Sequence, residues 1–228
     1  MRGLVRVGAA VPSLALGNVK ENMKRHLAMM REAKEKHVSI VTFPELSLTG
    51  YTCGDLFFQR RLLDDVTDAL LALRDEMPEG ILAVVGAPLE IEGALYNCAV
   101  VLHKGEIISA VPKTFLPNNG EFYEKRWFQS GDARRDASVA IPKLKTDVCR
   151  QAIFETEDGV RFGIELCEDL WAPLPPSTML SVEGAEIILN LSASNELLSK
   201  REYRQQLISQ QSARCQCGYV YVLSLIHI

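Results

Sequence analysis

Three residues in this sequence have side chains whose combined chemistry points to a reaction: Glu45, Lys113 and Cys167. Glu45 and Lys113 each follow an apolar, β-forming run through a single proline, and Cys167 follows such a run directly. The ends of strands in layered α/β proteins deliver side chains to a common crevice. We therefore expect the three side chains to meet at one site.

The chemistry available to a carboxylate, an ammonium group and a thiol is nucleophilic acyl transfer. A thiol is largely protonated at neutral pH, so it needs a base to accept its proton or a cation to stabilise the thiolate. Glu45 would supply the base. Lys113 and a backbone N–H after Cys167 would stabilise the oxyanion formed when the thiolate attacks an amide carbon. Ammonia would then leave, and water would release the acid from the thioester.

Each of the three residues also has a purely structural interpretation. Glu45 could be a capping carboxylate or a surface charge, Lys113 a solvated lysine, and Cys167 a buried packing residue. Spacing alone leaves these alternatives open.

The elements that must position these residues are predicted from hydrophobic periodicity and turn signals. Predicted strands cover residues 4–11, 38–43, 81–87, 96–103, 106–111, 152–154, 160–166, 187–191 and 218–222. Predicted helices cover residues 19–37, after a capping signal at Gly17 and Asn18, then 55–74, and 199–216 with Ser199 as the cap. Residues 114–135 are expected to form a functional loop. This order predicts a layered α/β or α+β domain.

Composition excludes several classes of protein. The 228 residues are 47% hydrophobic and carry a net charge of -4, with 25 basic and 29 acidic residues, so a globular core is expected and a basic nucleic-acid-binding surface is not. No apolar run approaches the length of a membrane span, and the N-terminus lacks signal-peptide features, so a cytoplasmic protein is expected. The six cysteines are expected to be separate thiols, with no metal site.

The segments around the three residues resemble the catalytic motifs of the carbon-nitrogen hydrolase (nitrilase) superfamily, in the family's order. They are residues 43–51 (FPELSLTGY), 111–113 (VPK) and 165–169 (ELCED), and the resemblance covers residues 4–222. It implies an αββα sandwich with Glu45 as general base, Lys113 as oxyanion stabiliser and Cys167 as nucleophile. It also implies that Glu124 assists as a second glutamate.

Flanking segments resemble, more narrowly, the glutaminase domains of glutamine-dependent NAD+ synthetases. These segments are residues 54–56 (GDL), 121–124 (EFYE), 173–177 (PLPPS) and 190–194 (NLSAS). By this resemblance, Ser194 and Lys200 contact the substrate glutamine. Two positions depart from the pattern: Lys200 stands where arginine is expected in some relatives, and Asn119 stands where a substrate-contacting tyrosine is expected.

The activity implied by the resemblance is hydrolysis of L-glutamine to glutamate and ammonia. The ammonia would pass to a C-terminal ATP-dependent synthetase domain, whose Ser-Gly-Gly phosphate-binding motif does not occur in this sequence. ATP and magnesium would bind that missing domain, so no cofactor is expected here, and the resemblance also suggests a homo-oligomer. The alternatives are a stand-alone nitrilase-family amidase or N-carbamoyl hydrolase, and a degenerate binding or scaffold domain.

The C-terminal end carries two further expectations. The last predicted strand has no following element, so the domain, residues 1–222, is expected to be incomplete and to expose an open strand edge. Residues 223–228 (LSLIHI) match what the end of a widely used sequencing adapter would encode, and are expected to be a non-native tail.

Other polar residues near the motifs have less specific interpretations. Cys53 is expected to be a packing thiol. Glu168 and Asp169 could support Lys113 or cap the turn after the third motif, and capping is favoured for Asp169.

Aromatic and histidine side chains also carry expectations. Four aromatic residues could line a pocket, form an oligomer contact or pack as a lid: Phe122, Tyr123, Trp127 and Phe128. His26 and His37 are expected at the surface of the first helix, which argues against a Cys–His catalytic pair.

Overall fold

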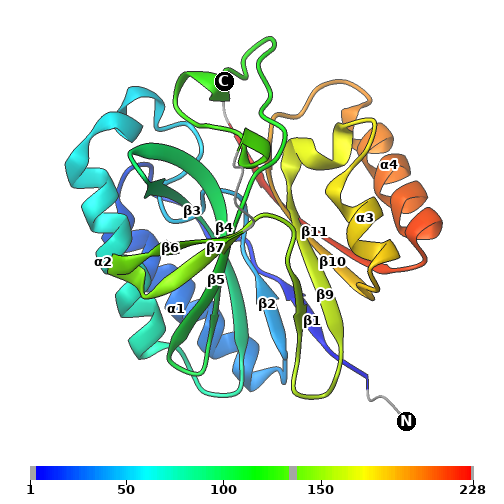
Figure 1. Ribbon diagram of the computed structural model, residues 1–228, viewed down its shortest axis with the longest axis horizontal. Helices are drawn as coiled ribbons and strands as arrows, with labels where there is room; N and C mark the ends of the chain where they lie inside the picture. Colours follow the sequence, from blue (N-terminus) through cyan, green and yellow to red (C-terminus); the bar gives the residue numbers. More distant parts are fainter. Residues whose placement is uncertain (1–3, 134–137, 227–228) are drawn as a thin grey trace.

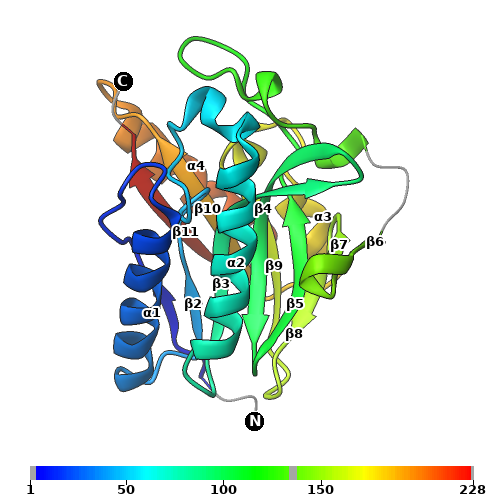
Figure 2. The same ribbon diagram turned by 90° about the vertical axis from the view of Figure 1, so that its left-hand side faces the viewer.

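The computed structural model describes residues 4–133 and 138–226. Two β-sheets pack face to face, and helices cover the outer side of each (Figure 1), giving the order helix, sheet, sheet, helix. Helices α1 (Val19–Glu35) and α2 (Arg60–Glu76) lie side by side over the larger sheet (Figure 2), and α3 (Pro176–Val182) and α4 (Lys200–Cys215) cover the smaller one. The expected αββα sandwich is confirmed.

The two sheets differ in size and in strand direction. The seven-stranded sheet has, in spatial order, β1 (Val7–Ala9), β2 (Ile40–Thr42), β3 (Leu82–Ile91), β4 (Ala94–His103), β5 (Glu106–Pro112), β7 (Thr146–Cys149) and β6 (Ser138–Ile141). The four-stranded sheet has β11 (Gly218–Leu225), β10 (Ile187–Ser194), β9 (Arg161–Leu166) and β8 (Ile153–Glu155). Because β9, β10 and β11 are parallel, their carboxyl ends share one edge, as those of β1, β2 and β3 do in the larger sheet.

The sheets meet through a buried aliphatic core. Its side chains come from strands of both sheets and include Ile40, Val84, Val101, Val111, Ile164, Leu166, Leu189 and Leu191. A second core lies between the larger sheet and the helices α1 and α2. Strands covered on both faces read as continuous apolar runs, which is why the sequence predicted them without alternation.

The N-terminal helix begins where the sequence predicts. The side chain of Asn18 accepts a hydrogen bond from the backbone N–H of Glu21 at 3.1 Å, which satisfies one donor of the first turn of α1. The two predicted hairpins are also confirmed, β4 with β5 and β8 with β9.

The prediction of one helix over residues 55–74 is wrong in its first turn. Residues Gly54–Phe58 form a 3₁₀-helix, η1, and α2 begins only after Gln59, whose backbone is extended. Phe57 is buried against the rings of Trp127 and Phe128, so tertiary packing overrides the helical period here.

The predicted cap of the last helix is also wrong. Ser199 has a left-handed backbone (φ 62°), and its side chain makes no capping hydrogen bond to α4. An N-cap side chain reaches the first-turn N–H groups from an extended backbone, which this residue does not have.

The expected surface position of His26 is wrong as well. Its ring is fully buried and lies 2.9 Å from Ser47 Oγ through Nε2, and burial lowers its pKa to about 4, so it is neutral. Asn22, one turn earlier, donates to the carbonyl of Leu48 at 3.0 Å. Helix α1 therefore holds the loop that follows Glu45, whereas His37 is exposed as expected.

Several elements were not predicted individually. Strands β6 and β7 and helix α3 lacked a clear periodic signal, and the loop at residues 114–135 contains two short 3₁₀-helices, η2 (Glu124–Arg126) and η3 (Gly131–Ala133), with 134 and 135 outside the described residues. Two further 3₁₀-helices are η4 (Pro142–Leu144) and η5 (Cys167–Trp171). None of the described helices has the length and apolar character needed to cross a membrane.

The last strand continues into the segment expected to be a tail. Strand β11 pairs with β10 through Leu225, which lies opposite Ser194. Residues 227 and 228 of that segment lie outside the described residues.

Candidate active site

Strand ends from both sheets bring the predicted residues together. Glu45 follows β2, Lys113 follows β5 in the same sheet, and Cys167 follows β9 in the opposite sheet. Glu124 joins them from the first position of η2. We call these four residues the catalytic cluster. All four are buried, and Cys167 is the most exposed at 7%.

A glycine lets Glu45 reach this position. The chain of the first motif crosses β3 at Gly86, where an added Cβ would lie 2.3 Å from the carbonyl oxygen of Pro44 and 2.4 Å from the amide nitrogen of Leu46. The carbonyl of Gly86 also accepts the N–H of Leu48 at 3.1 Å. Only a residue without a side chain permits so close a backbone approach.

Lys113 is the charge at the centre of the cluster. Its Nζ lies 2.6 Å from Glu45 Oε1 and 2.6 Å from Glu124 Oε1. Burial alone would lower the pKa of Lys113, but the charges of Glu124 and Glu45 outweigh burial and raise that pKa well above its usual value. The lysine therefore stays charged, which a buried oxyanion stabiliser requires.

Two neutral side chains complete the hydrogen bonding of the carboxylates. Asn97, on β4, donates through Nδ2 to Glu45 Oε1 at 2.7 Å and to Glu124 Oε2 at 3.5 Å. Tyr51, from the first motif, donates its hydroxyl to Glu124 Oε1 at 2.6 Å. Sequence reasoning gave neither residue a role, and the one available signal was a polar Asn97 within an apolar strand.

The backbone of Ala193 links base and nucleophile. The N–H of Ala193 donates to Glu45 Oε2 at 3.0 Å, and the thiol of Cys167 donates to the carbonyl of Ala193 at 3.4 Å. Cys167 has a left-handed backbone (φ 45°), a strained conformation for a residue with a side chain. This sharp turn from β9 into η5 places the sulfur beside the end of β10, where the charges of Glu45 and Lys113 act on it.

Burial sets the protonation of base and thiol. Burial raises the pKa of Glu45 to about 7, with Lys113 lowering it and Glu124 raising it. Burial, followed by the charge of Glu45, raises the pKa of the Cys167 thiol, and Lys113 opposes that increase. The resting thiol is therefore protonated, beside a carboxylate whose pKa suits proton transfer near neutral pH.

Asp169 joins the second and third motifs. Its carboxylate accepts N–H groups from Leu166 at 2.9 Å, Phe115 at 2.7 Å and Thr114 at 3.1 Å, while burial raises its pKa to about 8. Asp169 thus caps the turn at Cys167, as expected, and holds the chain that follows Lys113.

We call four residues the rim: the predicted substrate contacts Ser194 and Lys200, together with Asn119 and Phe122. Lys200 Nζ hydrogen-bonds Asn195 Oδ1 and lies 5.4 Å from the ring centre of Phe122 and 5.9 Å from that of Trp171. Ser194 is buried at the end of β10. Asn119 is exposed, and its carbonyl accepts the N–H of Phe122.

Two cavities adjoin the cluster. One, of about 350 Å³, is lined by Tyr51 and Phe122 among others. The other, of about 410 Å³, is lined by Thr114, Lys125 and Glu168, each of which directly follows a member of the cluster. Glu168 is half-buried, and burial raises its pKa.

Comparison with known proteins decides the family. The sequence profile of the carbon-nitrogen hydrolases ("Carbon-nitrogen hydrolase") matches residues 6–225. The chain belongs to the carbon-nitrogen hydrolase family. Among its relatives, the glutamine-dependent NAD(+) synthetase of Mycobacterium tuberculosis is 37% identical over 222 residues, which is 96% of this chain and 32% of the relative. The human protein of that name is 29% identical over 211 residues, 89% of this chain and 30% of the relative.

Solved structures agree with this family. A glutamine-dependent NAD(+) synthetase from Cytophaga hutchinsonii superposes with a TM-score of 0.84 and 30% identity, covering 98% of this chain and 36% of that one. An amidase from Nesterenkonia sp. has a TM-score of 0.76 at 16% identity, covering 98% of this chain and 77% of that one, and thus shares the fold. This carbon-nitrogen hydrolase chain spans about a third of the length of the curated relatives it matches.

Residues outside the cluster have structural roles in this carbon-nitrogen hydrolase. The Cys53 thiol donates to the carbonyl of Thr49 at 3.3 Å, and burial raises its pKa to about 11, as expected of a packing thiol. All six cysteines, each of which the structure describes, are free thiols. Of the four aromatic residues, Phe128 and Trp127 pack on Phe57, and Phe122 packs edge-on against Tyr51. Tyr123 is half-exposed and packs against Trp127.

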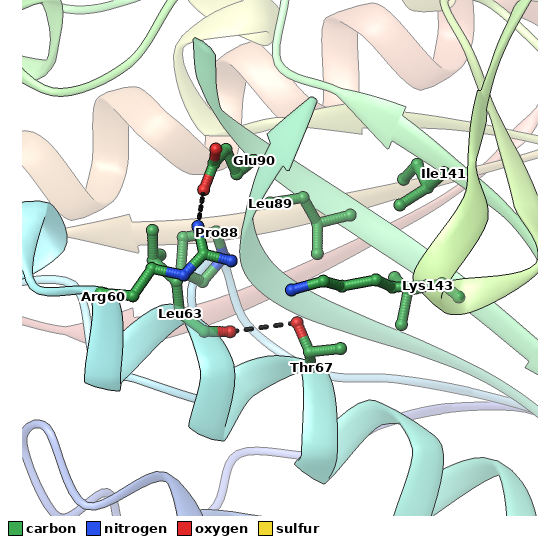
Figure 3. Close-up of a pocket in the computed structure, with 9 residues that line it drawn as sticks. Arg60, Leu63, Thr67, Pro88, Leu89, Glu90, Ile141 and Lys143 are labelled. Carbon is green, nitrogen blue, oxygen red and sulfur yellow. Dashed lines mark hydrogen bonds and ion pairs between the residues drawn. The ribbon is translucent and has the colours of Figure 1, made fainter. Parts of the chain in front are cut away.

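A further cavity of about 310 Å³ lies between α2 and the larger sheet, away from the cluster (Figure 3). Its charged side chains are already paired, since Arg60 lies 2.5 Å from Glu90 and 3.2 Å from Asp64, and Lys143 lies 3.7 Å from Asp64. This pairing offers no uncompensated charge to a ligand.

Proposed function

We propose that this carbon-nitrogen hydrolase cleaves the side-chain carboxamide of L-glutamine to glutamate and ammonia, with Cys167 as nucleophile. The observation that carries the proposal is the backbone of Ala193, whose N–H binds Glu45 and whose carbonyl accepts the Cys167 thiol, with Lys113 hydrogen-bonded to Glu45. The choice of glutamine is supported by the relatives named glutamine-dependent NAD(+) synthetase.

The first half of the reaction forms a thioester. Glu45 accepts the thiol proton, and the sulfur of Cys167 attacks the carboxamide carbon, placing the carbonyl electrons on oxygen. Lys113 and the backbone N–H after Cys167 stabilise this oxyanion in a site from which water is largely excluded. The tetrahedral intermediate collapses, the C–N bond breaks, and Glu45 returns the proton to the departing ammonia.

The second half of the reaction restores the thiol. A water molecule attacks the thioester carbon while Glu45 accepts its proton, and Lys113 again stabilises the oxyanion. The C–S bond then breaks, glutamate leaves, and Glu45 gives the proton to the sulfur of Cys167. Glu124, held by Lys113 and Tyr51, keeps the lysine in place through both halves.

The rim would bind the amino-acid end of glutamine. Lys200, close to the aromatic ring of Phe122, provides a cation for the α-carboxylate. Ser194, at the end of β10, provides a hydroxyl group. A lysine offers a point charge rather than the bidentate fork of an arginine, so the carboxylate would be held less firmly than by an arginine.

The ammonia would serve a synthetase domain that consumes ATP with magnesium. This part of the proposal rests on the relatives' name and on the third of their length that the chain spans. We further propose that residues 1–222 act without a cofactor of their own, in a cytoplasmic homo-oligomer.

The test is ammonia release from L-glutamine by the wild-type chain and by Cys167→Ala, with Cys53→Ala as the matched cysteine control. Release that is lost only in Cys167→Ala supports the proposal. In parallel, mass spectrometry follows labelling of Cys167 by a glutamine analogue with an electrophilic carbon in place of the carboxamide. Labelling by a short aliphatic analogue instead would favour a stand-alone amidase, and labelling by neither would favour a scaffold domain.

A further inference from the structure

We propose that Asn97 is a positioning residue that sets the pH at which the catalytic cluster can accept the Cys167 proton. This inference rests on the proposed function for its catalytic consequence, although the effect on the thiol can be measured without glutamine. Asn97 does not contact the reacting atoms in this proposal; it acts through the two glutamates.

The contacts of Asn97 reach three members of the cluster. Its Nδ2 donates to Glu45 at 2.7 Å and, more weakly, to Glu124 at 3.5 Å. Its backbone carbonyl accepts the N–H of Lys113 at 2.8 Å. The side chain is fully buried in β4, so water does not replace these bonds.

The carboxamide of Asn97 can take only one orientation. Both neighbouring carboxylates accept hydrogen bonds, so the NH₂ group must face them, because a flipped amide would place its carbonyl oxygen against carboxylate oxygen. The oxygen Oδ1 is buried and has no hydrogen-bond partner among the described residues. The residue is therefore used as a double donor.

Charge balance explains why a neutral double donor matters here. Glu45 and Glu124 share one cation, Lys113, and repel one another. Outside the cluster, the titratable groups that interact with its members are Tyr51, Glu168, Asp169 and Tyr221. The hydrogen bond from Asn97 favours ionised Glu45 and lowers its pKa against the effect of burial, so its loss would leave the proton on the base at neutral pH.

The experiment compares Asn97→Leu with Asn190→Leu. Asn190 is a matched control because it is also fully buried, and its side-chain hydrogen bonds, to Glu165, Tyr219 and Ser192, involve no member of the cluster. Two rates are measured against pH: ammonia release from L-glutamine, and alkylation of the Cys167-containing peptide by iodoacetamide, followed by mass spectrometry.

We expect Asn97→Leu to move the acid limb of both profiles upward by about one pH unit, and to reduce both rates about fivefold at pH 7. The deficit should shrink as the pH rises, with little change in KM. Asn190→Leu should leave the acid limb in place. An acid limb that stays in place in Asn97→Leu overturns the proposal, whatever the loss of rate.

A second variant, Asn97→Asp, tests the proposal if Asn97→Leu does not fold. Its carboxyl group has nearly the same shape and donates only while protonated, so its deficit should grow with rising pH, opposite to the leucine variant. A deficit independent of pH would indicate a packing role alone and would overturn the proposal. If alkylation follows these trends but no ammonia is released from glutamine, the proposed substrate fails while the role of Asn97 stands.

Discussion

The catalytic cluster and the rim differ in burial and in how their charges are paired. In the cluster, Lys113 has two carboxylate partners at 2.6 Å, and Glu45 and Lys113 are wholly buried at strand ends. In the rim, Lys200 is partly exposed, bonds one neutral amide, and otherwise faces aromatic rings, while Asn119 is exposed in a loop.

This difference in burial limits substitutions in the cluster, which would carry out the reaction, more than in the rim, which would bind the substrate. A buried charge that loses a partner carries a desolvation penalty that nothing nearby offsets, so the cluster tolerates little change. A half-exposed charge is screened by water, so the rim can exchange residues at small cost. The three motif residues lie in the cluster, and the two departures that the sequence resemblance suggested, Asn119 and Lys200, lie in the rim.

The strongest test of the cluster is removal of its base. Glu45→Gln retains the shape of the side chain and one acceptor oxygen, which can keep the hydrogen bond from Asn97 or the one from Ala193 but not both, and it cannot accept the thiol proton. We expect ammonia release to fall by about 1,000-fold. Steady-state kinetics at pH 8 measure the change, and circular dichroism checks the fold. Retention of a tenth of the activity would remove Glu45 from the mechanism.

A backbone change should break the same cluster from outside. Gly86→Ala places a methyl group against the backbone on both sides of Glu45, and the first motif must shift. We expect about a 100-fold loss of activity, since displacement of about 1 Å is enough for that, and a lower melting temperature. Gly218→Ala, where the added carbon comes no closer than 3.7 Å to its neighbours and the backbone is not left-handed, is the comparison for a glycine without such contacts.

The pH dependence should also follow from the cluster. The pKa of Glu45 is raised from 4.5 to about 7, and the base works only when ionised, so kcat/KM should rise about tenfold per pH unit below pH 7 and then level. The contribution of Glu45 to folding stability changes with pH in the opposite direction. The folded state holds this proton more tightly than the unfolded chain, so the contribution is full below pH 4.5 and is lost as the pH rises through about 7. Rates and chemical denaturation across this range test both signs.

Changes in the rim should alter affinity rather than chemistry. Lys200→Met removes the proposed partner of the substrate carboxylate, and we expect KM for L-glutamine to rise about 10-fold with kcat little changed. Lys200→Arg should keep or lower KM, because the guanidinium can bind a carboxylate with two bonds. A fall in kcat alone would place Lys200 with the cluster instead.

The smallest effect is expected from a substitution on the outer helices. Arg61 and Asp65 form an ion pair one turn apart on α2, with 86% of the arginine side chain exposed. Arg61→Ala should leave both activity and melting temperature unchanged within error, because solvent screens such pairs. A measurable loss of activity would mean that the outer face of α2 affects the site.

Much of this protein is determined by sequence alone. Apolar runs without alternation gave the strands of a doubly covered sheet, Asn18 gave the start of α1, and the residues directly after three of those runs gave Glu45, Lys113 and Cys167. These inferences succeed because periodicity and chain direction are local properties: a strand that ends at a polar residue presents it at a sheet edge wherever the sheet lies.

Only the tertiary structure decided the rest. His26 is buried because its helix packs on the loop after Glu45, and η1 replaces a helical turn because Phe57 packs on rings from the loop beyond residue 114. Asn97, Tyr51 and the backbone N–H of Ala193 join the cluster from positions up to 148 residues away in the sequence. A neutral side chain or a backbone amide has no local signature of function, and its role follows from the charge that the folded chain places beside it.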